Sequence, residues 1–105
     1  MTKIRVAPAD EFRPGSVKLV ERGFTSVGVY NCGGELLALE DRCSHDDGPL
    51  CEGDWDQDTC RVICPRHGAS FDLRSGRALT LPATQPVDTY PVSIDEDGWV
   101  VVEIP

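Results

Sequence analysis

The chain has 105 residues and a formal net charge of −8, with 18 acidic residues against 10 basic ones. This length corresponds to one domain, and the negative charge argues against nucleic acid or an anionic membrane as a partner. No apolar run approaches the roughly 20 residues of a membrane-spanning helix, and the charged start of the chain leads into no apolar signal segment. We therefore expect a single-domain protein that works in the cytoplasm.

Short strands separated by turn signals make up the first forty residues. Pro14-Gly15 marks a turn, Gly23 ends a strand, and residues 31–34 read as the tight connection of a hairpin. One helical turn at most is expected at residues 8–12. Alternating and β-branched residues predict strands at 3–7, 17–21, 24–30 and 36–40.

The pattern changes at Asp41, because residues 41–58 hold seven acids together with glycine and proline and read as loop. The remaining strands are predicted at 59–63, in a hairpin of 71–73 with 78–81, and at 87–94 and 98–104. This pattern predicts an all-β fold, an antiparallel sandwich or barrel. Within the single domain of residues 1–105, we expect a β scaffold from 1–40 and 82–105, with an inserted subdomain at 41–81.

Two short motifs in the insertion combine cysteine with histidine. Cys43 and His45 form C-x-H, Cys64 and His67 form C-x2-H, and the chain has no other histidine. Thiolate and imidazole are ligands for iron–sulfur clusters and for zinc. Zinc fingers more often pair two cysteines and then two histidines, so the mixed order favours a [2Fe–2S] cluster, with structural zinc as the alternative.

The two motifs and their flanks resemble the Rieske family. The likeness extends from Ala38-Leu39-Glu40-Asp41 through Leu50-Cys51-Glu52-Gly53 to the stretch Ile63–Asp72 and Gly76. It implies that one [2Fe–2S] cluster is bound, with Cys43 and Cys64 on one iron and His45 and His67 on the other. Within the family, the chain is most similar to the ferredoxin components of multi-component dioxygenases.

This resemblance implies a one-electron carrier, not an enzyme. Such a carrier takes electrons from a reductase and passes them to a terminal oxygenase or a similar acceptor, and we expect a monomer. An oxygenase would need a mononuclear iron held by two histidines and a carboxylate, whereas both histidines are already assigned. The other alternative is a zinc-binding or non-redox interaction module on the same fold.

The departures from the family pattern imply a low reduction potential. Respiratory Rieske proteins have an extra cysteine pair where this chain has Gly48 and Arg66, and hydroxyl side chains where it has Ala69 and Phe71. Hydrogen bonds to the cluster and its ligands stabilise the reduced form, so their loss lowers the potential.

Three cysteines lie outside the two motifs. An odd number of cysteines without an export signal argues against a disulfide framework. We therefore expect Cys32 to be a free thiol in a turn, and Cys51 and Cys60 to be small apolar residues near the cluster segment.

Overall fold

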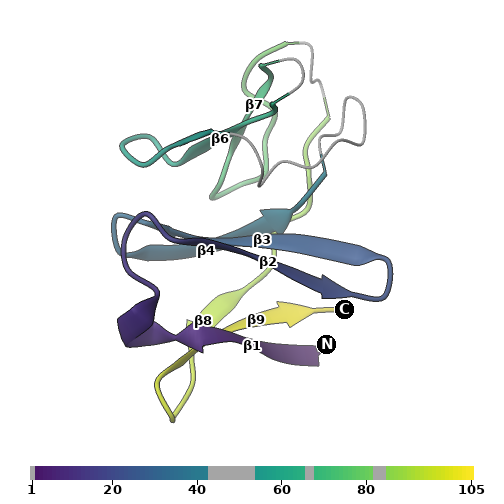
Figure 1. Cartoon of the computed structure of the whole chain (residues 1–105). Coiled ribbons are helices and arrows are strands. Elements are labelled where there is room, and N and C mark those ends of the chain that lie inside the picture. Colours follow the sequence, from purple (N-terminus) through teal and green to yellow (C-terminus); the bar gives the residue numbers. More distant parts are fainter. Residues whose placement is uncertain (1, 43–53, 66–67, 82–84) are drawn as a thin grey trace.

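The computed structural model describes residues 2–42, 54–65, 68–81 and 85–105. In this part of the chain, antiparallel strands form three sheets of three strands each (Figure 1). The predicted all-β class is confirmed, and the helical element present is the 3-10 turn η1 at Ala9–Glu11. No helix among the described residues is long and apolar enough to cross a membrane. The strands are β1 (Thr2–Pro8), β2 (Val17–Arg22), β3 (Thr25–Cys32), β4 (Glu35–Glu40), β5 (Trp55–Asp56), β6 (Arg61–Ile63), β7 (Ser70–Asp72), β8 (Val92–Ile94) and β9 (Trp99–Ile104).

The β2–β3–β4 sheet lies between the other two. Figure 1 shows the β1–β9–β8 sheet on one side of it and the small β5–β6–β7 sheet on the other. Thr2 of β1 pairs with Ile104 of β9, which places the two ends of the chain side by side. The middle sheet must therefore bury both of its faces.

Strand β3 shows how one sequence serves two cores. Successive side chains of a strand point to opposite faces, so Val27 and Val29 enter the core shared with the β1–β9–β8 sheet. Tyr30 and Cys32 enter the second core, which is shared with the small sheet. All four side chains are buried, and for this reason β3 reads as a nearly continuous apolar run.

The connection between β3 and β4 is a two-residue turn at Gly33 and Gly34. Both glycines have positive φ, 63° and 102°, as a type I′ hairpin turn requires. The Asn31 side chain supports this turn, since its amide donates to the Phe12 carbonyl (2.7 Å) and its oxygen accepts from the Gly34 N–H (2.8 Å). The predicted hairpin is confirmed, and Cys32 is the last residue of its first strand.

A returning segment, residues 87–90, ties the small sheet to the middle one. The Tyr90 N–H donates to the Ala38 carbonyl (3.0 Å), and the Glu40 N–H donates to the Asp88 carbonyl (2.8 Å). At its start, the Val87 N–H donates to the Gly76 carbonyl (2.9 Å). The hairpin after β7 is thereby held against the scaffold.

The sequence-based strand boundaries need three corrections. Strand β5 forms inside the stretch predicted as loop, because Trp55 pairs with Val62 and buries part of its ring. The second arm of the predicted 71–81 hairpin is reduced to one bridge, between Phe71 and Ala78. Residues 87–91 form only an isolated bridge, between Thr89 and Leu39, and include Pro91, which has no N–H to donate, so β8 begins only at Val92. The division into scaffold and insertion stays a prediction.

Candidate metal centre

Cys64 is the predicted ligand that the structure describes, and it directly follows β6. Its side chain is 1% exposed and packs in the core that lies against the small sheet. It takes part in no disulfide. A buried free thiol at the end of a short strand is well placed to act as a ligand whose position the fold controls.

The chain turns tightly after Cys64. The Cys64 N–H donates to the Ala69 carbonyl (2.7 Å), and the Gly68 N–H donates to the Cys64 carbonyl (3.0 Å). Gly68 has a φ of +74°, a conformation that side-chain-bearing residues rarely adopt. These two hydrogen bonds close a loop between β6 and β7, and the predicted ligand His67 belongs to that loop by sequence.

The hairpin that follows the loop is fixed by hydroxyl groups. The Ser70 N–H donates to Thr80 Oγ1 (2.9 Å), and the two hydroxyl oxygens lie 3.1 Å apart. The Leu79 N–H donates to the Ser70 carbonyl (2.8 Å). Residues 70–80 thus form a hydrogen-bonded hairpin directly next to the Cys64 loop in the sequence.

The other three predicted ligands, Cys43, His45 and His67, lie outside the described residues. Among the residues that are described, no group of three or more potential ligands comes together. The four-residue ligand set therefore stays a prediction. What the structure contributes is the burial of Cys64 and the closed loop that follows it, and both suit a thiolate ligand of an iron–sulfur cluster.

Ala69 and Phe71 stand where respiratory Rieske proteins have hydroxyl side chains. Both are fully buried beside this loop. Neither side chain can donate a hydrogen bond. The structure places the two residues on which the predicted low reduction potential depends, and the low potential itself stays a prediction.

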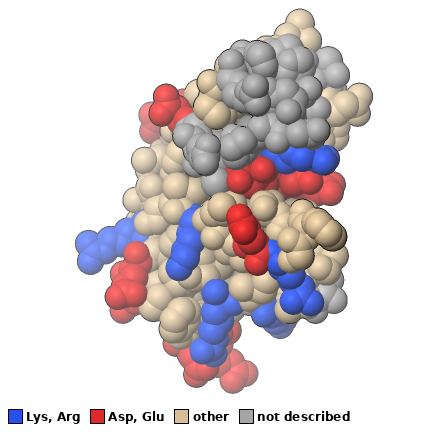
Figure 2. Space-filling model, turned by 45° about the vertical axis from the view of Figure 1, so that its right-hand side comes forward, with Lys and Arg blue, Asp and Glu red and all other residues tan. Residues whose placement is uncertain are grey.

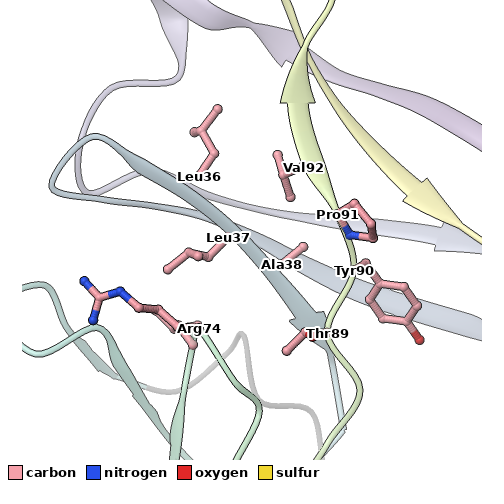
Figure 3. Close-up of a pocket in the computed structure, with 9 residues that line it drawn as sticks. Leu36, Leu37, Ala38, Arg74, Thr89, Tyr90, Pro91 and Val92 are labelled. Atoms are coloured by element: carbon pink, nitrogen blue, oxygen red, sulfur yellow. The ribbon is translucent and has the colours of Figure 1, made fainter.

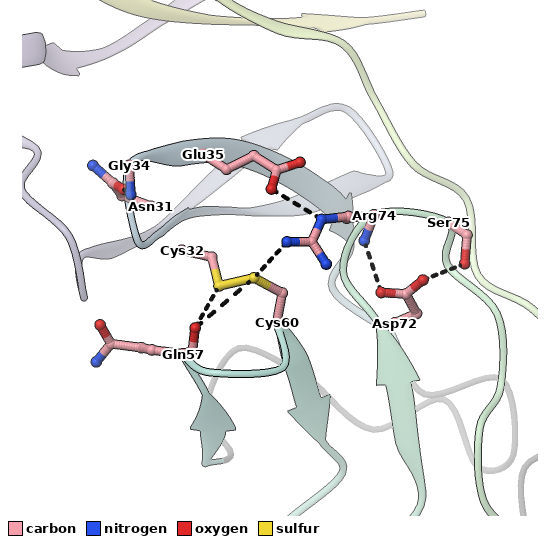
Figure 4. Close-up of polar contacts among 9 residues, drawn as sticks. All are labelled: Asn31, Cys32, Gly34, Glu35, Gln57, Cys60, Asp72, Arg74 and Ser75. Atoms are coloured by element: carbon pink, nitrogen blue, oxygen red, sulfur yellow. Dashed lines mark hydrogen bonds and ion pairs between the residues drawn. A yellow bond between two sulfur atoms is a disulfide. The ribbon is translucent and has the colours of Figure 1, made fainter.

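The expectation of free Cys32 and Cys60 is wrong, because the two residues form a disulfide (Figure 4). Their Cα atoms are 5.9 Å apart, within the usual range for a disulfide. The bond links the end of β3 to the turn before β6, over a sequence separation of 28 residues. Spacing alone offered no signal for it, since the partners meet only when the small sheet packs on β3.

An aromatic contact makes a second connection between the same two sheets. Tyr30 of β3 and Trp55 of β5 meet edge to face, with ring centroids 5.1 Å apart. Such pairs stabilise a fold beyond the area that they bury. Since Tyr30, Cys60 and Cys64 share one core, this contact helps to position the metal loop.

Two aspartates organise turns by accepting backbone N–H groups. Asp56 accepts from Asp58 (2.8 Å) in the turn before Cys60, and this hydrogen bond is the main reason that its pKa is lowered. Asp95 accepts from Trp99 (2.9 Å) between β8 and β9, and its pKa is lowered chiefly by that bond. The Asp56 turn bears on the metal site, because it positions Cys60 for the disulfide that joins the small sheet to β3.

A shallow pocket of about 390 Å³ lies between β4 and the returning segment (Figure 3). Arg74 stands at one end of it and Tyr90 at the other. The pocket does not include Cys64 or the loop after it, so it is separate from the candidate metal centre. Its lining residues are Leu36, Leu37, Ala38, Leu73, Arg74, Thr89, Tyr90, Pro91 and Val92.

Comparison with known proteins gives consistent matches. Residues 2–91 match the family model of the Rieske [2Fe-2S] domain. The 3-phenylpropionate/cinnamic acid dioxygenase ferredoxin subunit of Escherichia coli strain K12 is 38% identical over 105 residues, covering 100% of this chain and 96% of the relative. Among solved structures, the ferredoxin of carbazole 1,9a-dioxygenase from Nocardioides aromaticivorans IC177 superposes with a TM-score of 0.88 at 30% identity, covering 97% of both chains.

A further solved structure contains a relative together with another protein. It is described as a complex of reduced oxygenase and oxidized ferredoxin in carbazole 1,9a-dioxygenase. The matching chain has a TM-score of 0.87 at 33% identity, covering 95% of this chain and 91% of that one. The similarity therefore extends over nearly the whole length of both.

The fold, together with these matches, defines an iron–sulfur protein built on antiparallel sheets. The chain belongs to the Rieske [2Fe-2S] family. The resemblance stated from the sequence is confirmed, and so is the cofactor, one Rieske-type [2Fe–2S] cluster. The chain is an electron carrier of the dioxygenase-ferredoxin type and not an enzyme, which sets aside the zinc and oxygenase alternatives.

Proposed function

We propose that this carrier accepts one electron from a reductase and delivers it to the terminal oxygenase of an aromatic-ring dioxygenase system. The observation that carries the proposal is the match over the full chain to a dioxygenase ferredoxin subunit. A solved complex of oxygenase and ferredoxin that contains a similar chain supports the oxygenase as the acceptor. A bound Rieske cluster supplies one-electron chemistry, so a donor and an acceptor are both required.

The ligand set that we propose is Cys43 and Cys64 on one iron and His45 and His67 on the other. It is supported by the motif spacing and by the burial of Cys64. Substituting His67 with alanine should remove the native spectroscopic signal of the cluster. A variant that kept the unchanged signal would show that the ligand assignment is wrong.

The surface beside the Cys64 loop suits docking of a protein partner. Leu81 is 78% exposed and directly follows the hairpin of residues 70–80, and Leu79, within that hairpin, is 40% exposed. Exposed apolar side chains commonly mark contact surfaces. On the face shown in Figure 2, acidic and basic side chains of the described residues lie close to one another. We therefore propose the apolar pair as part of the docking surface.

The test is direct electron transfer to an oxygenase. The protein would be reduced with dithionite, desalted, and mixed anaerobically with an oxidised terminal oxygenase from the system of a close relative. We expect the protein to be reoxidised by transfer of one electron per chain. The rate of this transfer should be lowered by Leu81→Asp and unchanged by Phe24→Asp. Phe24 is a matched control because it is likewise a large exposed apolar side chain, but it lies in the β2–β3 turn. A cluster-bearing protein that no such oxygenase reoxidised would contradict the proposal.

The cytoplasmic location, the monomeric state and the division into scaffold (1–40 and 82–105) and cluster-binding subdomain (41–81) stay predictions. Size-exclusion chromatography with light scattering measures the oligomeric state, and a mass close to 11.5 kDa is expected. Cell fractionation with detection of the chain tests the location.

A further inference from the structure

The disulfide between Cys32 and Cys60 lies where two units of the fold meet. Cys32 ends β3 of the middle sheet, and Cys60 belongs to the turn that leads into β6 of the small sheet. Their side chains share a core with Cys64. A bond at this position couples the support of the metal loop to the scaffold.

The surroundings of the two sulfurs suit both of their redox states. The Gln57 carbonyl oxygen lies 3.1 Å from Cys32 Sγ and 4.0 Å from Cys60 Sγ, where it could accept a hydrogen bond from a thiol. Arg74 Nη2 lies 3.4 Å from Cys60 Sγ, where its charge favours a thiolate. A disulfide has no S–H group to donate to the Gln57 carbonyl and no negative charge for Arg74 to stabilise, so both interactions favour the reduced pair.

The backbone and the cover of the pair also distinguish this bond. Cys60 has a φ of +54°, the one positive value at a non-glycine position among the described residues, and this conformation is unfavourable for a residue with a side chain. The two cysteines are 4% and 2% exposed. The groups above them, Arg74 and Glu35, are about half-exposed and are joined only by an ion pair of 2.9 Å (Figure 4).

From these observations we propose that Cys32 and Cys60 form a second redox site, a two-electron disulfide–dithiol couple. While the two cysteines are joined as a disulfide, the protein retains its cluster for longer. Its substrate class is a small dithiol reductant. The site goes beyond the electron-carrier function, because it exchanges two electrons and two protons with thiols and requires neither the reductase nor the oxygenase.

The exchange proceeds in two balanced steps. A thiolate of the reductant attacks Cys32 Sγ, the bond between the two cysteines breaks, and Cys60 leaves as a thiolate beside Arg74. The second thiolate of the reductant then attacks the mixed disulfide, which releases Cys32 and leaves the reductant as a cyclic disulfide. Two protons end on the cysteines. The better leaving group departs first in such exchanges, and Arg74 assigns that role to Cys60.

Loss of the bond should loosen the junction. A crosslink that closes a loop of this length lowers the ratio of unfolded to folded protein by roughly a few hundred-fold in the chain-entropy model. Partial opening of the junction exposes the Cys64 loop, so we expect release of the cluster from the reduced form to be about tenfold faster. The oxidised form is therefore the longer-lived holoprotein.

The test compares the holoprotein in buffers of oxidised and reduced dithiothreitol, over a series of ratios. Alkylation followed by peptide mass spectrometry reports the state of Cys32 and Cys60, and visible circular dichroism after dilution into a chelator reports cluster release. The double variant Cys32→Ser/Cys60→Ser receives the same treatment. Since it has no disulfide to reduce, it separates loss of the bond from attack of the reagent on the cluster.

We expect Cys32 and Cys60 to be unlabelled in oxidising buffer and labelled together in reducing buffer. Release of the cluster should accelerate in step with labelling, and the double variant should release it at the faster rate in every buffer. Labelling of both cysteines in oxidising buffer, or equal release rates before and after labelling, would overturn the proposal. Thiol labelling does not depend on electron transfer, so this result is independent of the oxygenase experiment.

Discussion

Tyr30 and Trp55 meet edge to face, with ring centroids 5.1 Å apart, and bring a scaffold strand into contact with the small sheet. Tyr30 is buried, and Trp55 packs against the same core as Cys64. The Cys64 loop therefore depends on a contact made by residues outside the ligand motifs, because this contact positions the strands between which the loop runs.

Replacing Trp55 with alanine should lower the free energy of unfolding by about 2 kcal/mol and speed loss of the cluster, since the variant loses both the aromatic pair and the buried area. Trp99 offers a matched control. It is also half-buried, but it lies under Arg5 in the other outer sheet. Chemical denaturation and visible absorbance measure the two effects. If Trp99→Ala speeds cluster loss as much as Trp55→Ala does, the contact has no special role at the junction.

Gly76 and Gly23 allow steric fit to be separated from backbone strain. Both have positive φ, +76° and +60°. A Cβ added at Gly76 would clash with the Val87 carbonyl oxygen, whereas a Cβ at Gly23 would meet no atom within 4 Å. Gly23→Ala should cost about 1 kcal/mol, and Gly76→Ala at least twice that, measured by urea denaturation. Equal costs would mean that the returning segment can move away from the hairpin.

Acid should weaken the turns held by Asp56 and Asp95. Both have a pKa lowered from the ordinary value of 3.8, so their contribution to stability is complete above that value and is lost as the pH falls through the lowered folded-state pKa. The difference in Tm between the wild type and Asp95→Asn should thus be constant from pH 7 to about 5 and shrink below about 4. A difference that stayed constant down to pH 3 would show that the Asp95 charge does not stabilise the turn.

The reduction potential should lie near the lower end of the Rieske range of roughly −150 to +300 mV. Ala69→Ser introduces a hydroxyl group beside the Cys64 loop and should raise the midpoint by tens of millivolts. Ser70→Ala is the matched control, since the Ser70 hydroxyl lies against Thr80 Oγ1, and it should leave the midpoint nearly unchanged. Redox titration followed by circular dichroism gives the values, and a wild-type midpoint well above 0 mV would contradict this explanation.

Local patterns predicted the strands of the first forty residues well. Residues 24–30 and 36–40 alternate or run apolar, Gly33 and Gly34 suit one particular turn, and the observed strands differ from the predicted ones by one or two residues. The ligand motifs and their flanks were also sufficient to identify the family. These features are encoded by residues close together in the chain.

The features that the sequence analysis missed depend on tertiary contacts. Strand β5 has two residues, and it forms because Trp55 pairs with Val62 and packs its ring against Tyr30. The disulfide joins cysteines 28 positions apart, and the odd number of cysteines argued against it. Only the packing of the small sheet on β3 brings Cys32 and Cys60 together, so no local pattern could reveal the pair.

Electron paramagnetic resonance of the anaerobically purified, dithionite-reduced protein, combined with iron and zinc analysis, tests the central claim most directly. A Rieske centre predicts a rhombic signal with an average g value below that of the free electron, and about two irons per chain. A colourless protein that showed no signal and contained about one zinc per chain would contradict the assignment as an electron carrier.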